Sequence, residues 1–103
     1  MNIVGITACT AGIAHTYIAK EKIERAAQEL GHQCKIETQG TIGVESKLTE
    51  EEIRNADVVI IAADIGVGGK DRFKGKPVVE VPISMVMKQP KSIITKIQSQ
   101  LNK

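Results

Sequence analysis

The residues best suited to chemistry in this sequence form the run Cys9-Thr-Ala-Gly-Ile-Ala-His-Thr16. A β-rich segment, residues 2–8, precedes this run, and a helical pattern begins at Thr16. A cysteine at the turn from a strand to a helix lies among unpaired backbone N–H groups, and the helix dipole adds positive charge there. Because such surroundings favour both a thiolate and a bound phosphate dianion, the run predicts a phosphocysteine intermediate on Cys9.

The residues after Cys9 are of types that can surround a phosphate. Small side chains and a glycine let the backbone close around an anion. His15 can return over the anion as a neutral donor or face solvent at the start of the helix, and the threonines offer hydroxyl donors or helix caps. The predicted phosphate-binding loop consists of Thr10, Ala11, Gly12, Ile13, Ala14, His15 and Thr16.

Other reactive side chains are less clearly part of a site. Asp64 either restrains substrate access near the thiolate or caps its own loop. Cys34 has the alternating neighbours of a half-buried strand, which predicts a small core residue. Two cysteines make neither a disulfide framework nor a zinc site, and the sequence contains no evident carboxylate cluster for a metal. We therefore expect neither a metal nor a cofactor.

Hydrophobic patterns predict the elements that must position these residues. Strands are expected at residues 2–8, 33–37, 57–63 and 77–81, with a loop over 38–44. A first helix runs from Thr16 to a stop at Gly31, a second opens with the capping box Thr49-Glu-Glu-Glu52, and a last one starts near Pro90. The continuously apolar third strand is typical of a strand covered on both faces.

The alternation of strands and helices predicts one domain, residues 1–103, with an α/β fold. Right-handed crossovers make it a doubly wound, open four-stranded parallel sheet in the order 2-1-3-4, with helices on both faces. The phosphate-binding loop follows strand 1, and the strand order reverses between strands 1 and 3. The segments 9–15 and 64–69 meet at that switch, where ligands of such sheets bind, so the predicted fold also indicates Cys9.

The composition of the 103-residue chain excludes several classes of function. An aromatic content of 2% argues against a stacking platform for single strands, and a net charge of +2 argues against non-specific binding of nucleic acid. No apolar run approaches the roughly 20 residues that span a bilayer, and no signal peptide is evident, so we expect a cytoplasmic protein. Residues 70–103 carry eight basic and two acidic side chains, which indicates either a solvated face or a docking surface around the basic segment, residues 70–76.

Five segments together resemble a known family, and they are Cys9 to Thr16, Ile36-Glu-Thr-Gln-Gly40, Leu48-Thr-Glu-Glu-Glu52, Ala56 to Asp64, and Arg72-Phe-Lys-Gly-Lys76. Over essentially its whole length the sequence is similar to the fructose-type enzyme IIB component of the bacterial phosphoenolpyruvate-dependent sugar phosphotransferase system (PTS). The resemblance implies that phosphohistidine enzyme IIA passes a phosphoryl group to Cys9. Cys9 then passes it to a fructose-like sugar transported by the membrane enzyme IIC, at the inner face of the cell membrane.

Two other classes of function stay open from the residues alone. A low-molecular-weight phosphatase or an arsenate reductase has a similar scaffold, but such enzymes use Cys-x5-Arg, and here the sixth residue after Cys9 is His15. No Asp-Pro loop that could supply a general acid is evident either. A non-catalytic ligand-binding or regulatory domain explains the fold but leaves the Cys9 loop without a role.

Overall fold

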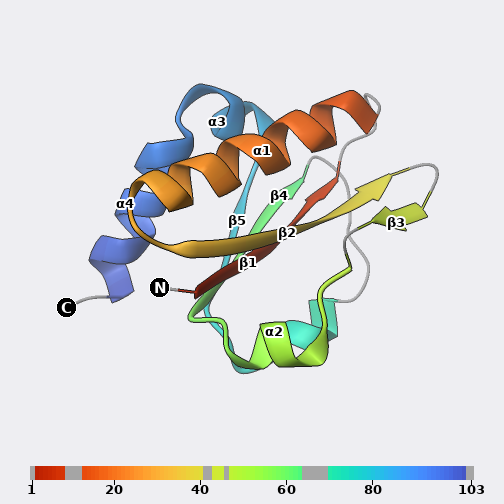
Figure 1. Ribbon diagram of the computed structural model, residues 1–103, viewed down its shortest axis with the longest axis vertical. Helices are drawn as coiled ribbons and strands as arrows, with labels where there is room; N and C mark the ends of the chain where they lie inside the picture. Colours follow the sequence, from red (N-terminus) through yellow and green to blue (C-terminus); the bar gives the residue numbers. More distant parts are fainter. Residues whose placement is uncertain (1, 9–12, 41–42, 46, 64–69, 102–103) are drawn as a thin grey trace.

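The computed structural model describes residues 2–8, 13–40, 43–45, 47–63 and 70–101. Its strands are β1 (Asn2–Ala8), β2 (Gln33–Gly40), β3 (Gly43–Glu45), β4 (Val58–Ala63) and β5 (Val78–Val81). Its helices are α1 (Ile13–Glu29), α2 (Glu50–Arg54), α3 (Ile83–Lys88) and α4 (Pro90–Leu101), and a short 3₁₀ helix, η1, covers Lys70–Phe73. Figure 1 shows the sheet as a central layer between two sets of helices.

The strands follow one another across the sheet in the order β3-β2-β1-β4-β5. β1 pairs in parallel with β2 and β4, and β4 pairs in parallel with β5. The predicted set of four parallel strands in the order 2-1-3-4 is therefore confirmed. The predicted loop over 38–44 is wrong in part, because β2 extends to Gly40 and β3 pairs antiparallel with it. The hydrophobic pattern misses this hairpin because its paired residues are polar or glycine apart from Val44.

Helices cover both faces of the sheet, as predicted. One face packs against α1, α3 and α4, and the other packs against α2 and η1 (Figure 1). The alternation of side chains along β1 separates the two cores, since Ile3 belongs to the three-helix side whereas Val4 and Ile6 belong to the side of α2 and η1. The cores are almost entirely aliphatic, and Phe73 of η1 is a buried aromatic residue on the second side.

Local signals in the sequence set three of the helix ends in the described part of the chain. The Thr49 hydroxyl accepts a hydrogen bond from the Glu52 N–H at 3.1 Å, and the Glu52 carboxylate accepts one from the Thr49 N–H at 2.8 Å, so the predicted capping box is present. Gly31, with a φ of 84°, follows the end of α1, and α4 begins at Pro90 as expected. α1 begins at Ile13, three residues before the predicted start at Thr16. The apolar pattern misses this first turn because Thr16, which lies on the buried face of the helix, is polar.

Candidate functional site

The carboxyl ends of the parallel strands meet at one edge of the sheet. Ala8, the last residue of β1, pairs with Gln39 of β2 and with Ala63 of β4. Cys9 follows Ala8 directly along the chain, and four residues separate β1 from α1. This edge, at the reversal of strand order, is the one at which the sequence predicts a site.

The structure describes part of the predicted site. The predicted residues outside the described ranges are Cys9, Thr10, Ala11, Gly12 and Asp64. The next three residues of the predicted loop, Ile13, Ala14 and His15, form the start of α1, and their side chains also lie outside the described part. The expectation that residues through Thr16 form a loop is therefore corrected, because its last four residues are helical.

A buried hydrogen bond joins the two elements on either side of the Cys9 segment. Thr7 Oγ1, on β1, donates to the backbone carbonyl of Thr16, on α1, at 3.1 Å. This bond fixes the first turns of α1 against the end of β1. α1 has no acidic residue in its first turn, so no carboxylate competes with an anion for the positive end of the helix dipole. The start of α1 is therefore electrostatically compatible with a nearby anion.

Glu37 carries a buried charge at the same end of β2 and is not among the predicted site residues. Its side chain is 1% exposed. Arg72 donates to Oε1 at 2.9 Å and to Oε2 at 3.0 Å, the Leu48 N–H donates to Oε1 at 3.0 Å, and Gln39 Nε2 donates to Oε2 at 2.9 Å. Burial by itself raises the pKa of Glu37, but the hydrogen bonds from Arg72, Gln39 and Leu48 outweigh it and lower the pKa.

A signal for this pair exists in the sequence. Glu37 alternates with Ile36 and Thr38 along β2, so it lies on the face that α2 and η1 must cover. A charged residue on a covered face requires a partner of opposite charge. The basic segment, residues 70–76, was the available source of one, and Arg72 is the residue that supplies it.

Part of the basic segment, residues 70–76, makes contacts within the molecule. Besides its pairing with Glu37, Arg72 has its guanidinium 5.2 Å from the centre of the Phe73 ring. Lys76 Nζ donates to the backbone carbonyls of Arg54 and Ala56, at 2.7 and 2.9 Å, beside the end of α2. Lys74 is exposed. Of the three cations of the predicted docking surface whose side chains the structure describes, Arg72 and Lys76 have structural partners, so Lys74 is the better candidate for contact with another molecule. The side chain of Lys70 lies outside the described part.

Cys34 is a core residue, as predicted. It packs against the core between the sheet and α1, and burial, reinforced by the nearby carboxylate of Glu24, raises the pKa of its thiol to about 12. The thiol is therefore protonated at neutral pH, and a protonated thiol is a poor nucleophile. His32, just before β2, contacts Gln98 of α4, with 3.0 Å between Nε2 and Oε1, so it holds the end of α1 against α4.

Within the described ranges, no group of three or more His, Cys, Asp or Glu side chains is arranged to hold a metal ion. In the same part of the chain, no helix is both long enough and apolar enough to cross a membrane.

Comparison with known proteins identifies the family. A family model for the lactose/cellobiose-specific IIB subunit of the PTS matches residues 4–96. The chain belongs to the PTS enzyme IIB family. This IIB chain is 46% identical over 99 residues to the PTS system fructose-like EIIB component 2 of Escherichia coli K12, a match that covers 96% of the chain and 93% of that relative.

Two further relatives show how IIB domains occur. The PTS system fructose-specific EIIABC component of Bacillus subtilis is 43% identical over 98 residues, which cover 95% of this chain but 15% of that protein. The solution structure of the enzyme IIB subunit of the PTS from Escherichia coli K12 matches with a TM-score of 0.92 and 32% identity, covering 98% of this chain and 94% of the other.

Membership in the IIB family confirms the resemblance predicted from the Cys9 motif and the segments that accompany it. Family members are phosphoryl carriers in sugar uptake, and this IIB chain therefore has that role. The alternative of a phosphatase or an arsenate reductase is correspondingly disfavoured. The fold prediction is confirmed at the same level, since a IIB subunit of known structure has the same architecture.

Proposed function

We propose that this IIB protein carries its phosphoryl group on Cys9. The Cys9 thiolate attacks the phosphorus of a phosphohistidine on enzyme IIA, so that a P–S bond forms, the P–N bond breaks and the imidazole takes up a proton. In the second step, a hydroxyl oxygen of a fructose-like sugar at enzyme IIC attacks the phosphorus. The P–O bond forms, the P–S bond breaks, the hydroxyl releases its proton, and the Cys9 thiolate is regenerated.

The position of Cys9 in the chain is the observation that carries this proposal. Cys9 follows Ala8, which pairs with Gln39 and Ala63 at the carboxyl edge of the sheet. Ligands of open α/β sheets bind at this edge. A transferring phosphoryl group needs positioning and neutralisation of its oxygens, and backbone N–H groups near a helix start supply both.

The described residues support Cys9 over Cys34 as the carrier. The pKa of the Cys34 thiol is raised to about 12 by burial, which leaves it protonated at neutral pH. Cys34 also lies near the beginning of β2, where it pairs with Ile3 at the start of β1, so it is at the opposite end of the sheet from Ala8. A thiol next to a helix start is the one expected to be ionised.

The proposed partners are an enzyme IIA as donor and an enzyme IIC as the site of transfer to sugar. A relative named as an EIIABC component contains a segment like this chain within a much longer protein, which supports direct contact with IIA and IIC domains. The protein is proposed to act in the cytoplasm, at the inner face of the membrane, through IIC. His15 is proposed as an additional donor to the phosphate, and Asp64 as an accessory residue beside the thiolate.

The intact mass of the protein after incubation with phosphorylated enzyme IIA tests the proposal. Wild type and Cys34→Ser are expected to gain one phosphoryl group, whereas Cys9→Ser gains none because serine is a much weaker nucleophile at neutral pH. A phosphoryl adduct on Cys9→Ser at the wild-type rate, or its absence from a folded Cys34→Ser, would overturn the assignment. His15→Ala is expected to slow transfer by roughly tenfold to a few hundredfold, as for the loss of one donor to a developing charge.

A further inference from the structure

The buried pair of Glu37 and Arg72 requires a reason other than stability. Replacing a buried ion pair with well-packed apolar side chains is often neutral or stabilising, because both charges must be removed from water. Glu37 is 1% exposed, and the Arg72 side chain is 24% exposed. The neighbouring core of Leu48, Ile53 and Phe73 shows that apolar side chains fill this face of the sheet. Keeping this pair therefore costs free energy of folding, which indicates that its geometry has a functional role.

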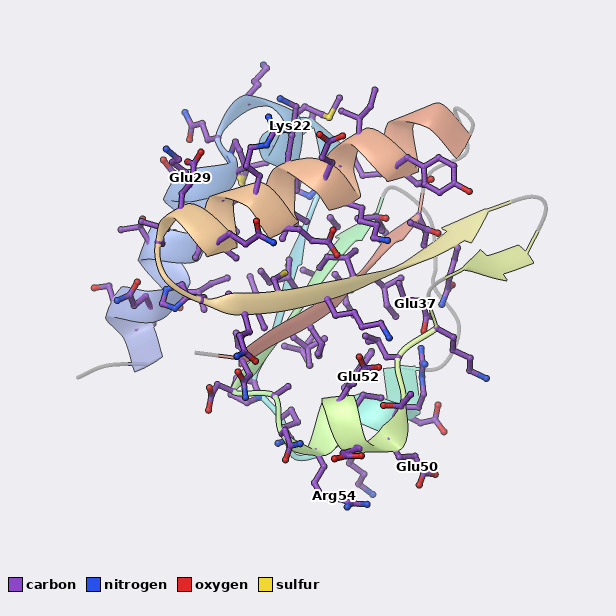
Figure 2. All side chains as sticks on the ribbon, in the orientation of Figure 1. Lys22, Glu29, Glu37, Glu50, Glu52 and Arg54 are labelled. Atoms are coloured by element: carbon purple, nitrogen blue, oxygen red, sulfur yellow. The ribbon has the colours of Figure 1, made fainter. Side chains whose placement is uncertain are left out.

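The Glu37 carboxylate joins its own strand to two segments that lie further along the sequence. Through Arg72 it holds η1, through the Leu48 N–H it holds the chain that enters α2, and through Gln39 it holds the end of β2 itself. All four donors lie at 2.9–3.0 Å, so the carboxylate has little freedom to move. Figure 2 shows Glu37 at the side of β2 that faces α2, toward the β3 end of the strand.

These contacts are one strand away from the residue before Cys9. Gln39, whose side chain donates to Glu37, pairs through its backbone with Ala8 at the end of β1. The Thr7–Thr16 hydrogen bond holds the other side of the same segment, because Thr7 points toward the face covered by α1. The end of β1 is thus held on one face by α1 and along one edge by β2, which Glu37 joins to η1 and to the chain entering α2.

We propose that Glu37 and Arg72 are positioning residues for the chemistry of Cys9. The pair holds the end of β2 and, through the pairing of Gln39 with Ala8, the residue that precedes Cys9. The inference rests on the proposed function of Cys9. A displacement of about 1 Å at reacting groups costs on the order of a hundredfold in rate, so a pair that touches no reacting atom can still control the transfer.

The bidentate geometry distinguishes arginine from lysine at position 72. Each Nη atom of Arg72 donates to a different oxygen of Glu37, which fixes the relative orientation of η1 and β2. Lysine keeps the positive charge but presents a point charge without this planar fork. Arg72→Lys is therefore the variant that preserves the charge and removes the orientation.

The experiment measures the pH profile of Cys9 alkylation by iodoacetamide, with peptide mapping to separate Cys9 from Cys34. Glu37→Gln and Arg72→Gln are both expected to raise the thiol pKa of Cys9 and to slow its alkylation at pH 7 by about tenfold. A direct effect of charge predicts shifts of opposite sign, because the first variant leaves an unpaired cation and the second leaves an unpaired anion. Arg72→Lys is expected to shift the Cys9 alkylation profile in the same direction as Arg72→Gln. Because it keeps the positive charge, this variant also provides the test if a neutral variant fails to fold.

Glu52→Gln is the matched control. Glu52, a residue of α2, is likewise a carboxylate on the α2 side of the sheet, and it accepts a hydrogen bond at 2.8 Å from Lys35, which lies two residues before Glu37 on β2. We expect this variant to leave the Cys9 profile unchanged. Cys9 profiles in the Glu37 and Arg72 variants that match that of Glu52→Gln, or that shift in opposite directions, overturn the proposal.

Phosphoryl transfer from enzyme IIA is measured on the same variants and is expected to fall by about tenfold to a hundredfold for Glu37 and Arg72. A wild-type protein that accepts no phosphoryl group on Cys9 would contradict the proposed function. The alkylation profile would still decide whether the pair controls the thiol, so the two failures are distinguishable.

Discussion

The Thr7 hydroxyl on β1 donates a buried hydrogen bond to the Thr16 carbonyl on α1, across the segment that contains Cys9. Thr7 and Thr16 are both almost completely buried. Thr7 is the next-to-last residue of β1, and Thr16 lies in the first turns of α1. The bond therefore joins the strand to the helix next to the predicted anion site. We therefore expect the Thr7 hydroxyl to help position the proposed site through α1.

Thr7→Val tests this contact with almost no change in shape. We expect the free energy of unfolding to fall by about 1–2 kcal/mol, because the hydrogen bond is lost and a buried carbonyl loses a donor. We also expect slower phosphoryl transfer to Cys9, measured by intact mass against time. A variant that is destabilised by this amount yet accepts the phosphoryl group at the wild-type rate would contradict a role for the bond in the site.

The two cysteines are expected to differ in reactivity. Iodoacetamide at pH 7 should modify Cys9 faster than a free thiol and Cys34 much more slowly, because the pKa of the Cys34 thiol is raised to about 12. Peptide mapping after brief labelling measures both sites in one sample. In denaturant the two rates should converge, which serves as the control. Preferential labelling of Cys34 in the folded protein would count against the site assignment.

Glu37 is expected to make stability depend on pH. Its folded pKa is lowered, so its contribution is fully present above the unfolded value of about 4.3 and is lost as the pH falls through the folded value. At pH 7 the Glu37→Gln variant should lose about 3 kcal/mol of unfolding free energy, as expected for a buried charge deprived of its partner.

Urea denaturation at several pH values measures this dependence. The difference between wild type and Glu37→Gln should shrink as the pH falls below about 4.3 and wild-type Glu37 becomes protonated. A difference in unfolding free energy that stays constant over this range would show that ionisation of Glu37 does not stabilise the fold.

Lys74 and Lys76 are expected to respond differently to replacement by methionine. Lys76→Met removes the donor to the carbonyls of Arg54 and Ala56 and should lower the unfolding free energy by about 1 kcal/mol. Lys74→Met should leave stability unchanged, slow transfer from enzyme IIA and weaken its dependence on salt, because an exposed cation acts through encounter with its partner. Transfer by Lys74→Met at the wild-type rate and salt dependence would assign this lysine to the solvated surface.

The sequence predicts the parallel part of the fold because its signals are local and strong. The apolar run of β4, the capping box at Thr49 and the glycine that follows α1 each act within a few residues, and the crossover rule then limits the strand order. Cys9 was identified as the candidate nucleophile in the same way, from its place after a strand and before a helix. These inferences need no knowledge of distant contacts.

The tertiary structure decided the features that depend on partners far apart in the chain. Glu37 and Arg72 are 35 positions apart, and the alternation along β2 places Glu37 on a covered face without identifying Arg72 as its partner. Likewise, β3 is a strand because β2 offers its open edge, and Thr7 meets Thr16 because α1 folds back over β1. Burying a charge costs much free energy unless a partner of opposite charge lies beside it. For Glu37 that partner is brought close by the packing of α2 and η1 against the sheet, not by proximity in the sequence. Composition and periodicity thus determined the parallel sheet and indicated its reactive edge, whereas the contacts that hold this edge in place follow from the assembled fold.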